Sequence, residues 1–123
     1  MEKVTLEFPL SSTSRDTIWE MISTPGGLAA WMADDVTVNG DKYLFSWGDD
    51  EEREAEMTGK RIGTYVRFHW LDEEPKTYFE LRIAYSAFTR TFTLVVTEEA
   101  VHDTADVLQA LWSAHSDQIL KLI

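Results

Sequence analysis

The stretch from Asp103 to Ile123 constrains the fold more than any other part of the chain. One set of residues recurs with the spacing of a single helical face, and it comprises Leu108, Leu111, Trp112, His115, Ile119 and Leu122. The opposite side is polar, with Asp106, Gln109, Ser113, Ser116, Asp117 and Lys121, and Asp103 is placed to cap the N-terminus. A helix of about 20 residues is roughly 30 Å long. Such a helix needs a large apolar partner.

The upstream sequence can supply that partner as a sheet. About seven segments alternate apolar and polar residues with the period of a strand that has one buried face, namely 4–8, 36–38, 43–47, 55–57, 66–70, 79–85 and 92–96. Asn39-Gly40-Asp41 is a tight-turn signal that joins two of them as a hairpin. The links between the others are also short, so we expect an antiparallel meander.

Two short helices are expected between the first two strands. Thr13 with Asp16 approximates a capping box for the first helix, which should run to Ile22. Thr24 followed by Pro25 marks the start of the second. The two glycines that come next should form a bend between helices, because no Lys-Ser or Lys-Thr pair follows to complete a phosphate-binding loop. Strands between an early helix pair and a final long helix predict an α+β fold.

Composition excludes several classes of protein. The 123 residues predict a single domain over 1–123. The absence of cysteine removes disulfides and thiolate chemistry, and a net charge of −11 makes nucleic acid and anionic membranes poor partners. With neither a membrane-spanning apolar run nor a secretory leader in the sequence, we expect no membrane span and a cytoplasmic location.

Much of the negative charge lies in three short runs, at 49–52, 72–74 and 98–99. We interpret these runs as solvated ends of hairpins. The alternative is an acidic rim that attracts a basic partner or a cation. The first run lacks the spacing of a calcium-binding loop.

Four segments carry a resemblance to a known family: SRDTIWEMISTPGGLAAW at 14–31, MADDVTVNGDKYLFSW at 32–47, VRFHW at 66–70 and LWSAHSDQILKL at 111–122. They resemble the START-like helix-grip (SRPBCC) superfamily over nearly the whole chain, and small bacterial START-like proteins and activator-of-heat-shock-ATPase-like proteins most of all. The resemblance implies a β-α-α-β6-α fold, in which a curved antiparallel sheet of about seven strands grips the long helix around an apolar cavity. Family members mostly bind or carry hydrophobic molecules, and several bind another protein.

The apolar faces of the strands and of the last helix converge on one interior. We expect ligand-binding positions at Trp31, Phe45, Trp47, Phe68, Trp70, Leu81, Tyr85, Phe92, Leu108, Leu111, Trp112 and His115. The alternative is a solid core made of the same residues. Two features favour a cavity: sheet curvature opens space, and several Trp need partners for their indole N–H groups.

His115 is the polar group that we expect to face this interior. It is either a core histidine bonded to a nearby carbonyl or hydroxyl, or a group that orients the polar end of a ligand, with a tyrosine such as Tyr85. The histidines show no metal-site spacing, and we expect neither a metal nor a cofactor.

We interpret the chain as a non-catalytic protein that binds a small hydrophobic or lipid-like molecule. The second hypothesis is a protein-interaction module with an acidic surface, including the case of a homodimer. The third is a cyclase-like or hydrolytic enzyme, which would need His115 or Tyr85 as a buried acid or base with a shifted pKa.

Overall fold

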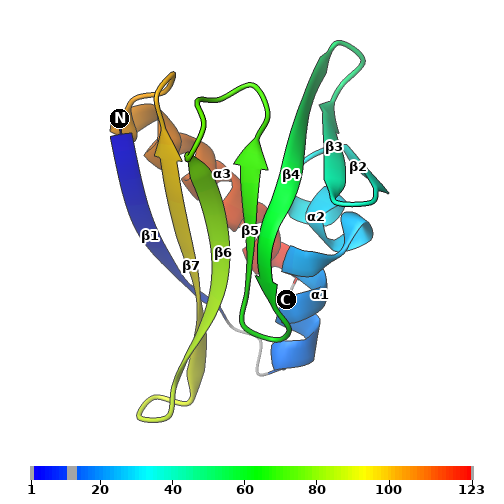
Figure 1. Ribbon diagram of the computed structural model, residues 1–123. Coiled ribbons are helices and arrows are strands. Elements are labelled where there is room, and N and C mark those ends of the chain that lie inside the picture. Colours follow the sequence, from blue (N-terminus) through cyan, green and yellow to red (C-terminus); the bar gives the residue numbers. More distant parts are fainter. Residues whose placement is uncertain (1, 11–13, 123) are drawn as a thin grey trace.

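The computed structural model describes residues 2–10 and 14–122, in which seven strands form one antiparallel sheet of order β1-β7-β6-β5-β4-β3-β2. The strands are β1 (Glu2–Leu10), β2 (Asp35–Asn39), β3 (Lys42–Trp47), β4 (Glu51–Arg61), β5 (Tyr65–Trp70), β6 (Tyr78–Ser86) and β7 (Thr91–Ala100). The helices are α1 (Arg15–Ser23), α2 (Pro25–Trp31) and α3 (Ala105–Leu122), and all of them lie behind the sheet in Figure 1. The predicted α+β fold, with a curved sheet around the long final helix, is confirmed.

From β2 to β7, each strand pairs with its neighbours in the chain, and β1 pairs with the other edge of β7. The β2–β3 hairpin turns at the predicted position, where Asn39 faces Lys42 and Gly40 has a φ of 65°. A positive φ suits glycine because it has no Cβ to clash with the backbone. The first and last strands are therefore neighbours, and α3 follows directly from β7.

The two short helices begin at capping side chains. Ser14 caps α1 by accepting a hydrogen bond from Thr17 N at 3.3 Å, whereas the predicted cap, Thr13, lies outside the described residues. Thr24 caps α2 by accepting from Gly27 N at 2.9 Å, as predicted. At Gly27 an added Cβ would lie 2.0 Å from the carbonyl oxygen of Glu20, so only glycine lets α2 pack this closely on α1. The glycine pair is thus a bend between helices.

The start of α3 and its buried face differ from the sequence prediction. Thr104, rather than Asp103, holds the capping position, because its Oγ1 accepts from Val107 N at 3.3 Å. The buried residues of α3 are Leu108, Trp112, Ser116 and Ile119. Leu111 and Leu122, predicted to be inward, are 41% and 52% exposed, and Ser116, predicted to be outward, is 3% exposed.

The buried face of α3 differs from the predicted one in part because Ser116 can be buried at little cost. Its side chain is small, and its hydroxyl is satisfied by donating to Ser113 O at 2.8 Å, so burial leaves no polar group unpaired.

No helix in the described part of the chain is long and apolar enough to cross a membrane.

Aromatic rings join α3 to the sheet. Phe68 stacks on Phe79 with ring centroids 5.0 Å apart, and Phe79 meets Trp112 at 5.6 Å. All of these rings are 0–1% exposed. This part of the interior is solid core rather than open space.

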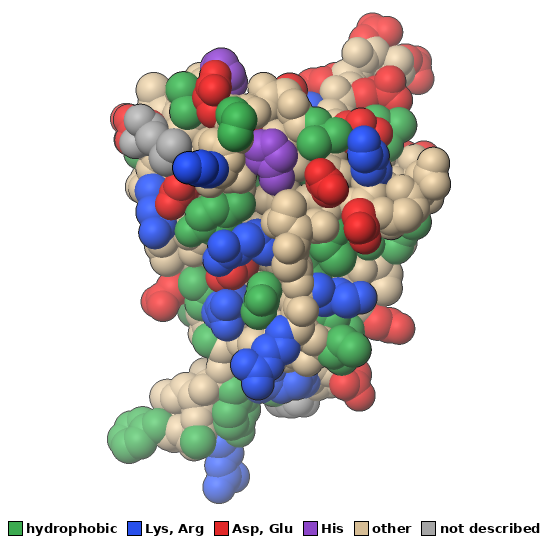
Figure 2. Space-filling model, viewed as in Figure 1, with side chains coloured by type: hydrophobic (Ala, Val, Ile, Leu, Met, Phe, Trp, Pro, Cys, Tyr) green, Lys and Arg blue, Asp and Glu red, His purple; other side chains and the backbone are tan. Residues whose placement is uncertain are grey.

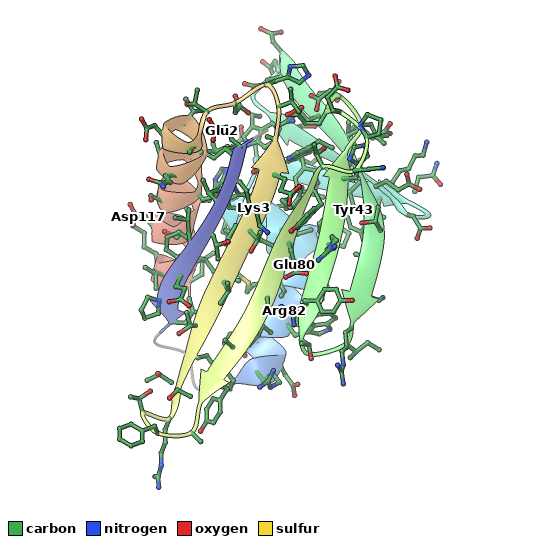
Figure 3. All side chains as sticks on the ribbon, turned by 60° about the vertical axis from the view of Figure 1, so that its left-hand side comes forward. Glu2, Lys3, Tyr43, Glu80, Arg82 and Asp117 are labelled. Carbon is green, nitrogen blue, oxygen red and sulfur yellow. The ribbon has the colours of Figure 1, made fainter. Side chains whose placement is uncertain are left out.

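The outer face of the sheet is polar and carries many of the cations. Figure 3 shows Lys3, Glu80 and Arg82 on the side of the sheet that faces away from the helices, with Asp117 on the far side of α3. Glu80 accepts from Arg67 at 2.9 Å and from Arg82 at 3.1 Å. Figure 2 shows Lys and Arg side chains gathered on this face.

Candidate functional site

A cavity of about 260 Å³ lies between the sheet and α3, at the upper end of the sheet in Figure 1, where β3, β5 and β7 end and β4 begins. Its wall is mostly apolar and consists of Met32, Trp47, Glu51, Arg53, Trp70, Glu98, Leu111, Trp112 and His115. Ligand pockets usually measure about 300–1,000 Å³. The cavity lies just below this range and therefore suits a small molecule.

A second and more open groove of about 390 Å³ adjoins the cavity between α2 and α3. It shares Met32, Trp47 and His115 with the cavity and adds Trp31 and Gln118. The two spaces therefore share part of their walls beside α3.

Glu98 is the buried carboxyl of the cavity wall, and it is 3% exposed. The alternation of β7 directs it inward, because it lies two residues beyond the buried Val96. Its neighbours on the adjacent strands are Val4 and Phe79, which are both apolar. Trp112 Nε1 donates to its Oε1 at 2.7 Å.

Burial raises the pKa of Glu98 from 4.5 to about 7. Hydrogen bonds from the indoles of Trp112 and Trp70 and the positive charge of Arg53 favour the ionised form, but the loss of solvation outweighs them. Asp103 adds a smaller repulsion that acts in the same direction as burial. Near neutral pH the cavity therefore holds a carboxyl group that is balanced between its neutral and charged forms.

Arg53 is fixed against the cavity wall by two kinds of contact. Its Nε and Nη2 donate to the carboxylate of Asp72 at 2.9 and 2.8 Å, and its guanidinium lies 4.0 Å from the centroid of the Trp70 ring. The hydrogen bond from Arg53 holds the pKa of Asp72 below its ordinary value. The charge of Arg53 is thus matched by Asp72 rather than by Glu98.

His115 lies three residues after Trp112 on α3 and is half-buried. Its ring meets the rings of Trp112 and Trp31 edge-on, with centroids 5.6 and 6.5 Å apart. Burial lowers the pKa of His115. The imidazole is therefore mainly neutral at pH 7, when it can either donate or accept a hydrogen bond.

The predicted site residues separate into three groups. Trp47, Trp70, Leu111, Trp112 and His115 line the cavity, and Trp31 borders the adjoining groove. Phe45, Phe68, Leu81 and Leu108 are 0–1% exposed and belong to the packed core. Tyr85 and Phe92 lie in β6 and β7 toward the far hairpin, where their rings meet at 4.8 Å and Tyr85 is 47% exposed. The structure does not bring Tyr85 to His115.

Two acidic residues interpreted as solvated are in fact buried. Besides Glu98, Glu73 is 9% exposed, and its carboxylate accepts from Val101 N at 3.2 Å and from His102 N at 3.3 Å. Glu73 therefore anchors the loop that leads into α3. The run at 49–52 is exposed, as predicted.

Glu98 and Arg53 were not among the predicted site residues, although strand alternation signals both. Glu98 continues the buried series of β7, and Arg53 continues the alternation of Ala55 and Met57 in β4. Glu98 lies within an acidic run and Arg53 directly follows another, and such charged stretches are ordinarily solvated. Glu98 also provides the buried acid with a shifted pKa that an enzyme would need.

We expected the indole N–H groups to favour a cavity because they need partners, but this does not apply to two of the tryptophans. Trp31 Nε1 donates to Met21 O at 2.7 Å, and Trp47 Nε1 donates to Met32 O at 2.8 Å. Backbone carbonyls at the helix ends supply these partners without any open space.

Within residues 2–10 and 14–122, no group of three or more His, Cys, Asp or Glu is placed to hold a metal ion.

Comparison with known proteins identifies the family of the chain. The profile of the START-like superfamily domain matches residues 1–123. The protein BfR322 from Bacteroides fragilis is 37% identical, with a TM-score of 0.66, and the match covers 98% of this chain and 90% of that chain. None of the curated proteins matches.

Two further solved structures share the fold at lower identity. The Aha1 dimer from Colwellia psychrerythraea is 16% identical with a TM-score of 0.75, and 99% of this chain and 93% of that chain are covered. DynU16, a protein of the dynemicin biosynthetic locus, is 17% identical with a TM-score of 0.80, over 98% of this chain and 46% of that chain. On the profile match over its full length, the chain belongs to the START-like superfamily.

Proposed function

We propose that this protein binds a small, largely apolar molecule in the cavity between the sheet and α3, without catalysing a reaction. The observation that carries the proposal is the composition of the cavity wall, where Trp47, Trp70 and Trp112 lie with the carboxyl of Glu98. Aromatic walls with a small number of polar groups are typical of sites that bind small organic molecules.

The position of Leu111 makes the proposal testable. Leu111 lines the cavity yet is 41% exposed, so a larger side chain there can reduce the open space without overfilling the core. Leu120 is the matched control, since it lies on the same helix with 39% exposure and outside the cavity wall. Leu111→Trp should abolish binding, and Leu120→Trp should leave it unchanged.

Native mass spectrometry of protein purified from a cell lysate provides the measurement. We expect an adduct of small-molecule mass that disappears on denaturation and is absent from Leu111→Trp. The proposal fails if the two variants carry the same adduct. It also fails if no adduct is found and a panel of small aromatic molecules leaves the melting temperature unchanged.

The raised pKa of Glu98 and the neutral His115 favour acid–base catalysis as an alternative. The same preparation separates the two functions, because a binding protein returns the released molecule chemically unchanged after long incubation. Conversion of the molecule, and its loss in Glu98→Gln, would establish an enzyme instead.

A protein-interaction role is a third possibility, and the exposed acidic run at 49–52 favours it. This run forms the end of the β3–β4 hairpin and extends beyond the sheet at the upper right of Figures 1 and 2. Retention of a basic partner should weaken as salt increases, because exposed charge contacts are screened. Retention that is independent of salt would reject this role.

A further inference from the structure

Building on the proposed function, we propose that the bound molecule is an amine, whose ammonium group lies against the carboxylate of Glu98 inside the tryptophan-lined wall. The aromatic rings and the charges around the cavity both favour this class of ligand.

The aromatic wall is suited to a cation. Trp47, Trp70 and Trp112 line the same small space, and the face of an indole attracts positive charge. The protein already uses this attraction, because the guanidinium of Arg53 lies over the Trp70 ring at 4.0 Å. Trp112 is packed against Phe79 and His115, but Trp47 is only partly buried and can offer its ring to a second cation.

The charges of the cavity also favour an amine. Within residues 2–10 and 14–122, no Lys or Arg nitrogen forms an ion pair with Glu98, and Arg53 is paired with Asp72. Glu51 brings a further carboxylate to the wall, and the whole chain has a net charge of −11. An anionic ligand would face these carboxylates, and a neutral one would leave the ionised Glu98 without a counter-ion.

Several groups share the cavity with Glu98 or act on its pKa, and they determine how binding depends on pH. They are Arg53 and Glu51 on β4, Trp70 on β5, Asp103 before α3, and Trp112 and His115 on α3. An ammonium ion stabilises the carboxylate, so binding of an amine should displace the proton of Glu98. The ionised fraction of a group with a pKa of about 7 rises about tenfold between pH 6 and pH 8. Protonation of His115 at lower pH would add repulsion, which acts in the same direction.

Three probes of nearly equal size test the inference: 2-phenylethylamine, 2-phenylethanol and 3-phenylpropionate. Their dissociation constants can be measured from intrinsic tryptophan fluorescence. At pH 8 we expect the amine to bind at least about tenfold more tightly than the alcohol or the acid. Its affinity should fall about tenfold from pH 8 to pH 6, while the affinity of the alcohol should not fall.

A pair of variants isolates the carboxyl group. Glu98→Gln keeps an oxygen that can accept from Trp112 and should lose most of the preference for the amine. Glu99→Gln is the matched control, because it removes the same charge from the adjacent residue of β7, whose carboxylate lies 3.8 Å from Lys3 Nζ. It should retain that preference.

The outcomes distinguish this inference from the proposed function. If the alcohol or the acid binds as tightly as the amine, or if the affinity of the amine is independent of pH and of Glu98, the amine is rejected while the cavity remains a binding site. If none of the probes binds, the inference is overturned, and the native mass spectrum decides the proposed function separately.

Discussion

Trp112 Nε1 and Glu98 Oε1 form a hydrogen bond of 2.7 Å that joins α3 to β7 at the wall of the cavity. Trp112 is 1% exposed and Glu98 is 3% exposed. A buried ionisable group usually reduces stability compared with an apolar side chain of similar size. Retaining a carboxyl group here is what we expect of a position that serves binding rather than packing.

Replacement of Glu98 by glutamine should change how stability depends on pH. The pKa of this carboxyl is raised in the folded protein from 4.5 to about 7, so the folded state favours the protonated form. Its contribution to the free energy of unfolding is complete below about pH 4.5 and falls by about 3 kcal/mol as the pH rises through 7.

Urea denaturation of both proteins between pH 4.5 and pH 8 measures this effect. Relative to the wild type, Glu98→Gln should gain about 3 kcal/mol of unfolding free energy over that range. The lowered pKa of His115 acts with the opposite sign but is common to both proteins, so it cancels in the difference. A difference that does not change with pH would contradict the raised pKa.

Replacement of Trp112 by phenylalanine should raise the pKa of Glu98 further. The indole N–H stabilises the carboxylate, and phenylalanine lacks this donor. We expect a loss of about 1–3 kcal/mol in stability. The titration of Glu98 can be followed by NMR of its side-chain carboxyl carbon.

Trp31→Phe is the control for this experiment. It removes the hydrogen bond from Trp31 Nε1 to Met21 O, so it also costs stability, but it does not alter a contact of Glu98. An equal shift of the Glu98 titration in both variants would show that general loosening of the core, rather than the lost donor, is the cause.

The close contact between α1 and α2 predicts opposite results for two adjacent glycines. Gly27→Ala would place a Cβ 2.0 Å from Glu20 O and should destabilise the protein by about 1–3 kcal/mol, because the helices must separate. Gly26→Ala meets no atom within 4 Å and should be neutral or stabilising by up to about 1 kcal/mol. Thermal unfolding of the two variants compares them, and equal losses would contradict this packing.

Local patterns predicted most of the fold because their physical causes are local. Alternation indicated the strands, and Thr24 with Pro25 marked the start of α2, since a cap and its helix are neighbours in sequence. The prediction of the buried face of α3 was partly wrong, because the tertiary structure decides which side of a helix is covered. The small Ser116 is buried, and Leu111 is left beside the cavity.

The chemistry of the site was harder to predict than its apolar wall. Glu98 occupies an inward position of β7, but a charged residue in an acidic pair is ordinarily solvated, and only tertiary structure shows that Trp112 reaches it. The pairing of Arg53 with Asp72 depends on the register of β4 and β5 and on the turn that follows. Such contacts join segments whose separate patterns carry no information about each other.

The five indole N–H signals of the protein provide the most direct test of binding between the sheet and α3. Trp47, Trp70 and Trp112 line the cavity, whereas Trp19 lies outside it. During an NMR titration with 2-phenylethylamine at pH 8, the three cavity signals should shift together and saturate, while that of Trp19 stays in place. Cavity signals that do not move, or a Trp19 signal that shifts as far as they do, would contradict a binding site in this cavity.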